Sequence, residues 1–164
     1  MAAIRSIMRN LRQQSRAGPL AAQRRFLNLH EYQSLTIMKD HGVCVPHIEV
    51  VKSMSELDAQ ADKIKGDCVV KAQVLAGGRG LGHFKENGFQ GGVHVTSSRE
   101  ELRECAEKML GKTLITKQTG EAGKPCNFLM LAEKFQIKEG GEKYFAILMD
   151  RGAGGPIMIG SKVG

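Results

Sequence analysis

Residues 68–82, CVVKAQVLAGGRGLG, combine the pattern of a buried strand with that of a glycine-rich loop. Val69, Val70 and Val74 with Leu75 are residues that favour strands, and the glycine pair that follows ends any regular strand. Lys71 therefore projects from a strand, where its ammonium group must reach either water or an anion held beside the sheet. The stretch predicts a buried strand that carries a candidate anion site.

The loop after this strand is suited to phosphate. Arg79 offers a planar fork of donors, and glycines let the backbone approach a ligand and turn its N–H groups toward it. The loop lacks the Gly-Lys-Ser/Thr ending of a P-loop, and Lys85 stands where a G-x-G-x-x-G pattern would require glycine. A flexible hairpin between two strands would fit the same residues. The glycines of this loop are Gly77, Gly78, Gly80 and Gly82.

Helix and strand signals alternate along the chain and predict an α/β fold. The expected N-caps are Asn28, with Glu31 three residues later, then Ser53 with Glu56, and Ser98 with Glu101. The expected helices cover residues 29–41, 53–66 and 98–110. Further strands are expected over residues 92–96, 128–132, 144–149 and 156–159, the last two as a hairpin turned at 152–155, with a polar loop at 117–126.

The formal net charge of +7 is concentrated near the start of the chain. Residues 1–25 hold six arginines and no acidic residue, and the remainder carries 18 basic and 17 acidic side chains. A body this close to neutral, with only 5% aromatic residues, does not predict a nucleic-acid surface. No run of about 18 apolar residues predicts a membrane span.

Residues 1–26 have the pattern of a mitochondrial transit peptide. Ile4, Ile7, Met8 and Leu11 recur at helical spacing between arginines, and no acid precedes Glu31. A basic amphipathic helix lying on a membrane surface has the same periodicity. We favour import into the mitochondrial matrix, with cleavage near residue 26.

Several segments resemble, in order and spacing, the succinate-CoA ligase β-subunit family. They are LNLHEYQS at 27–34, VVKAQVLAGGRG at 69–80, GGVHV at 91–95, KQTGEAGKPCN at 117–127 and ILMDR at 147–151. The resemblance implies an ATP-grasp fold over residues 27–164, in which a nucleotide lies between two α/β subdomains. Residues 47–133 would form the smaller subdomain, and residues 27–46 with 134–164 would form part of the second, which is expected to be truncated at Gly164.

The resemblance also implies which residues contact the nucleotide. The strand lysine of the family falls on Lys71, and its phosphate-covering Gly-Arg-Gly falls on Gly78, Arg79 and Gly80. At the base, Glu133 would lie at the hinge beside the adenine and Gln136 would offer a main-chain contact. Glu142 resembles a further nucleotide-binding acid of the family, and Pro46 stands where ADP-forming members resemble one another, which favours ATP/ADP.

Members of this family convert succinate, CoA and a nucleoside triphosphate to succinyl-CoA, phosphate and nucleoside diphosphate, in the tricarboxylic acid cycle. The resemblance implies a heterodimer with an α subunit that carries the phosphorylated histidine, so no catalytic residue is expected on this chain. Magnesium is expected as a cofactor, with its ligands beyond Gly164. A weakly nucleotide-binding, non-catalytic short form and a β subunit of a related malate-CoA ligase stay open as alternatives.

Overall fold

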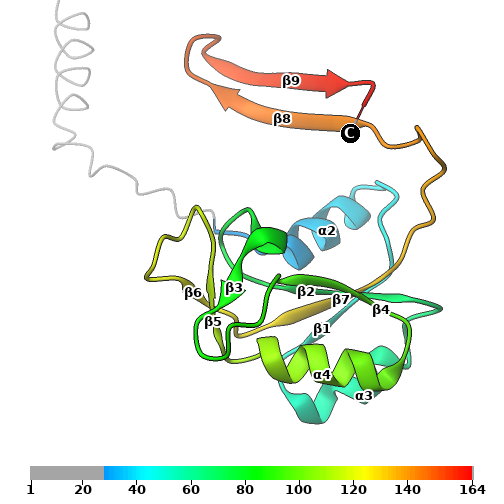
Figure 1. Ribbon diagram of the computed structural model, residues 1–164. Helices are drawn as coiled ribbons and strands as arrows, with labels where there is room; N and C mark the ends of the chain where they lie inside the picture. Colours follow the sequence, from blue (N-terminus) through cyan, green and yellow to red (C-terminus); the bar gives the residue numbers. More distant parts are fainter. Residues whose placement is uncertain (1–27, 164) are drawn as a thin grey trace, which may run out of the picture.

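The computed structural model describes residues 28–163, so the expected transit peptide lies outside the described residues (Figure 1). The body is built on a four-stranded sheet in which every neighbouring pair is antiparallel. Its strand order is β1 (Ile48–Val51), β7 (Leu129–Glu133), β2 (Cys68–Ala72) and β4 (Val93–Thr96). The expected mixture of helices and strands is confirmed, in the α+β form that an antiparallel sheet gives.

Helices lie on both faces of this sheet (Figure 1). The lower face in the figure carries α3 (Leu57–Ala61) and α4 (Arg99–Met109), and the opposite face carries α2 (Glu31–Asp40). The core lies between the sheet and the helices α3 and α4. There Leu57, Leu102 and their apolar neighbours pack against alternate residues of β2. By contrast, α2 contributes no fully buried residue.

The glycine-rich loop leads into a small second sheet. A short 3₁₀ helix, η2 (Arg79–Leu81), is followed by β3 (His83–Phe84), which pairs with β5 (Thr113–Ile115), and β5 pairs with β6 (Lys124–Pro125). The sequence did not predict these short strands or β1. The predicted strand of Lys71 also ends at Ala72, before Val74 and Leu75.

The last strands form the predicted hairpin, β8 (Tyr144–Asp150) with β9 (Gly155–Ser161). It stands apart from the sheet, above α2 in Figure 1. Its apolar side chains are largely exposed, including Phe145 at 66% and Met149 at 77%. No helix of the described residues is long and apolar enough to cross a membrane.

The cap predictions had different outcomes. Ser98 is confirmed as the N-cap of α4, since its hydroxyl accepts a hydrogen bond from the Glu101 amide at 3.1 Å. The first cap was wrong: α2 begins after His30, whose amide donates to the Gln33 side chain at 2.8 Å, and Asn28 lies two residues earlier.

The predicted second helix was also wrong as a single element. It consists of a 3₁₀ turn, η1 (Met54–Glu56), and the short α3, separated from β2 by Gly66 in a left-handed conformation. Ser53 stands at the N-cap of η1 as predicted, but its hydroxyl makes no capping hydrogen bond and pairs instead with that of Ser55 at 2.8 Å.

Gly82 joins the glycine-rich loop to the second sheet, and the space at this position is too small for a side chain. A Cβ atom there would lie 2.5 Å from the backbone oxygen of Ile115, whereas at Gly80 it would meet nothing within 4 Å. We expect Gly82→Ala to lower the free energy of unfolding by about 1–3 kcal/mol, and Gly80→Ala to change it by less than about 1 kcal/mol. Urea denaturation of both variants measures the difference, and equal stability would contradict this close approach.

Candidate functional site

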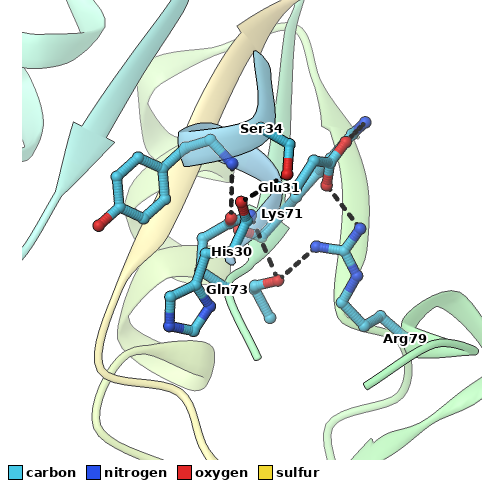
Figure 2. A network of polar contacts seen from close by, with 8 residues as sticks. His30, Glu31, Ser34, Lys71, Gln73 and Arg79 are labelled. Atoms are coloured by element: carbon cyan, nitrogen blue, oxygen red, sulfur yellow. Dashed lines mark hydrogen bonds and ion pairs between the residues drawn. The ribbon is translucent and has the colours of Figure 1, made fainter. Parts of the chain in front are cut away.

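Lys71 faces α2 because of the alternation along β2. Cys68, Val70 and Ala72 are buried on the α3 and α4 side, so Lys71 projects from the other face. Its side chain is 27% exposed, and its ammonium group lies 2.9 Å from a carboxylate oxygen of Glu31. The predicted need of this lysine for an anion is thus met by a side chain from α2 (Figure 2).

Arg79 reaches the same carboxylate from the glycine-rich loop. Gly78 precedes η2 with a left-handed φ of 72°, a conformation that side chains disfavour, and this turn aims Arg79 back toward β2. Its Nη2 donates to the second carboxylate oxygen of Glu31 at 2.5 Å, and its Nη1 donates to the Ala72 carbonyl at 2.7 Å. Both terminal nitrogens of the guanidinium are therefore engaged.

Glu31 joins the two predicted cations, and the sequence analysis considered it only as a capping residue. It is the first residue of α2, where the helix dipole favours a carboxylate. Burial would raise the pKa of Glu31, but hydrogen bonds from Arg79 and Lys71 outweigh burial and hold that pKa below its ordinary value. An acid at the start of a helix was the only local signal for this role.

A second set of contacts holds the start of α2 against the sheet. Gln73 is 1% exposed, and its side-chain oxygen accepts a hydrogen bond from the Tyr32 amide at 3.2 Å. The rings of His30 and Tyr32 both lie near Phe128, with centroid distances of 5.9 and 6.4 Å. Burial and the nearby Arg79 lower the pKa of His30, so its imidazole is neutral at neutral pH.

The glycine-rich loop borders an open cleft of about 350 Å³, which Glu31 and Arg79 also line. The amide of Gly77 donates to the Gln118 side chain at 2.7 Å. Within residues 28–163, no protein group accepts from the amides of Gly78, Arg79 and Gly80. Of these residues Arg79 lines the cleft, and Lys71, Gly78 and Gly80 lie next to lining residues along the chain or through Glu31. The cleft is lined by Asn28, Leu29, Glu31, Val74, Leu75, Ala76, Gly77 and Arg79.

The residues expected at the base lie at another part of the sheet. Glu133 ends β7 opposite Cys68, three residues along the strand from Met130, which is opposite Lys71. That offset is about 10 Å along the strand. The Glu133 side chain accepts a hydrogen bond from the Lys65 amide at 3.3 Å on the α3 side, so its carboxylate points away from Lys71.

The other three expected base residues lie in the segments next to Glu133. Pro46 precedes β1 and is half-buried, and the carbonyl of the next residue, His47, accepts from the Glu133 amide at 3.0 Å. Gln136 and Glu142 lie in the exposed segment between β7 and β8. The structure thus gathers Lys71 and Arg79 in one place, and Pro46 and Glu133 in another.

The model of the ATP-grasp domain family matches residues 28–164 of this chain. The chain belongs to the ATP-grasp family. This match bears out the fold expected from the resemblance, and it places the Lys71 strand and the glycine-rich loop within an ATP-grasp domain.

Among curated proteins, the chain is similar to β subunits of succinate-CoA ligases. It is 49% identical to the mitochondrial ADP-forming β subunit of Dictyostelium discoideum, over 88% of this chain and 32% of the relative. The mitochondrial GDP-forming β subunit of the same organism is 48% identical, over 89% and 34%. That of Mus musculus is 44% identical, over 92% and 34%. The chain spans about a third of the length of these relatives, and the expected resemblance is confirmed.

Because the pKa of Glu31 is lowered, the contribution of this carboxylate to the free energy of unfolding should depend on pH. A lowered pKa means that the carboxylate stabilises the fold above the ordinary value of 4.5 and that this contribution is lost as the pH falls through the folded-state pKa. We expect Glu31→Gln to lower the free energy of unfolding by about 1–2 kcal/mol at neutral pH, and by progressively less below pH 4.5.

Urea denaturation of both chains over a pH series measures this difference. Glu104→Gln is the control, because Glu104 pairs with Lys108 on the exposed surface of α4 and should change stability little at any pH. A stability difference for Glu31→Gln that is constant down to acidic pH would contradict the ion pairs of Glu31.

Proposed function

We propose that this chain is the nucleotide-binding part of a succinate-CoA ligase β subunit that acts in the mitochondrial matrix. The observation that carries the proposal is the convergence of Lys71 and Arg79 on a single carboxylate beside the glycine-rich loop. It occurs in an ATP-grasp domain that is 49% identical to such a subunit. An anion can be bound there by two cations and by unpaired loop amides.

Lys71 and Arg79 would act on nucleotide phosphates by electrostatics. Phosphoryl transfer spreads charge over the phosphate oxygens, and preplaced donors stabilise that charge without forming a covalent bond. Lys71 is held by a rigid strand and Arg79 by its hydrogen bond to the Ala72 carbonyl, so both donors are positioned before a ligand arrives. Gly78 and Gly80 would add backbone amides.

The adenine would lie toward the end of β7. The backbone of Glu133, with Gln136 and Glu142 from the following segment, would surround it, and Pro46 would bear on the choice of ATP/ADP. Relatives named for ADP and for GDP have nearly equal identity to this chain, so the ATP preference rests on Pro46 alone. Residues 47–133 would form one subdomain, with residues 27–46 and 134–164 in the second.

The proposed reaction joins succinate to CoA at the expense of ATP, through a phosphohistidine on an α-subunit partner, as in the tricarboxylic acid cycle. Large exposed apolar side chains on the β8–β9 hairpin have the character of a surface that further polypeptide covers. Within the described residues, no three His, Cys, Asp or Glu side chains gather to hold a metal ion. We assign the described residues no role in binding magnesium.

Nucleotide binding by the full chain is the direct test of the site. We expect calorimetry to detect ATP binding, and Lys71→Ala or Arg79→Ala to weaken it by about 10- to 100-fold each, the worth of one charged hydrogen bond. Lys63→Ala is the matched control, because Lys63 also pairs with a glutamate, Glu49, but at another edge of the sheet. Unchanged ATP affinity in both site variants would remove the site assignment.

The reaction requires a second test with the partner. We expect the chain, extended by the remaining sequence of a relative and co-expressed with a succinate-CoA ligase α subunit, to form ATP from ADP, phosphate and succinyl-CoA. The combined variant Lys71→Ala with Arg79→Ala should lower kcat/KM for ADP by at least about 100-fold. Malonyl-CoA and malyl-CoA serve as alternative substrates, and preference for malyl-CoA would favour a malate-CoA ligase.

A further inference from the structure

Glu31 occupies the position between the two cations that an incoming phosphate needs. Its two oxygens bind Lys71 Nζ and Arg79 Nη2, one oxygen on each cation (Figure 2). Nη1 of Arg79 donates to the Ala72 carbonyl, which fixes the guanidinium with its Nη2 directed at Glu31. A phosphate that contacts Lys71 Nζ and Arg79 Nη2 together would take the place that the Glu31 carboxylate now occupies.

We propose that Glu31 is a positioning residue that acts as an internal anion: it holds Lys71 and Arg79 in the empty site and is displaced by nucleotide phosphate. The proposal rests on the proposed function, and it adds a residue that must leave for the ligand to bind. It also makes the site selective, because a ligand must compete with a carboxylate that two cations hold in place. A polyphosphate does so through several charged oxygens, and a weak monovalent anion does not.

Charge and burial both support displacement over simultaneous binding. The three side chains are only 19–27% exposed, so water screens their charges incompletely. A phosphate placed against Lys71 while Glu31 stayed would bring two anions together in this partly buried space, which is unfavourable. When Glu31 leaves, the phosphate takes both cations and the carboxylate reaches water.

The attachment of α2 makes such a movement inexpensive. α2 buries no residue completely, and the start of the helix is held to the body by Glu31, by the Tyr32–Gln73 hydrogen bond and by ring contacts at Phe128. Release of Glu31 removes two ion pairs and opens no apolar core. Phosphate binding would therefore also loosen α2 on the sheet.

The test compares the full chain with Glu31→Gln by calorimetry at neutral pH, using sodium tripolyphosphate, ATP and adenosine. We expect Glu31→Gln to bind tripolyphosphate and ATP roughly three- to tenfold more tightly, because the competing charge is gone, and to bind adenosine as the wild type does. Glu49→Gln is the matched control, since Glu49 also bridges two partners, Lys63 and His47, and it should leave all affinities unchanged.

Equal or weaker binding of tripolyphosphate by Glu31→Gln, or no binding by either chain, overturns the proposal. If ATP binds well and Glu31→Gln has no effect, this inference fails and the proposed function stands. If Glu31→Gln tightens tripolyphosphate binding but ATP binds no better than tripolyphosphate, the inference stands and the proposed nucleotide site fails.

A measurement on the unaltered chain covers the case in which Glu31→Gln does not fold. Carboxyl-carbon NMR reports the pKa of Glu31, which Arg79 and Lys71 lower in the ligand-free chain. We expect this pKa to rise toward its ordinary value when tripolyphosphate saturates the site, because both cations then leave the carboxylate. A pKa that stays low would show that Glu31 remains paired and would overturn its displacement.

Discussion

Two cationic side chains lie beside the sheet with most of their surface removed from water, and that burial requires an anion. The alternation of side chains along β2 directs Lys71 to this face of the sheet. Arg79 is held at the same face by its hydrogen bond to the Ala72 carbonyl. An unpaired charge in such a place is costly. Glu31 supplies this anion. Because Glu31 belongs to α2, the position of this helix is coupled to the two cations of the proposed phosphate site.

This dependence explains how α2 is held without a core of its own. α4 buries Leu102, Ala106 and Met109 against the sheet, whereas α2 contributes no fully buried residue. The hydrophobic effect that holds α4 on the sheet is therefore weak for α2. Polar contacts at the first turn of α2 contribute a larger share of the free energy that holds it there. Such contacts can be exchanged for ligand contacts at small cost, whereas a packed core cannot.

The sequence predicted what depends on neighbours along the chain. The Lys71 strand, the glycine-rich loop and the Ser98 cap were readable because their determinants lie within a few residues of one another. The Glu31 contacts join residues 40 and 48 positions apart, and no local pattern reports such a distance. The strands β3, β5 and β6 are two or three residues long and are defined by their partners, so periodicity could not reveal them.

The same alternation separates the site from the core by a single residue. Val70 and Ala72 are fully buried beneath the sheet, and Lys71 between them faces Glu31 above it. A slip of β2 by one residue against β7 would place the lysine in the core and a valine in the site. The pairing of Lys71 with Met130 is therefore a requirement both for folding and for the proposed ligand site. Because the two faces of the sheet share only the backbone, a change of charge at Glu31 would act on the proposed phosphate site and leave the packing between the sheet and α3 and α4 intact.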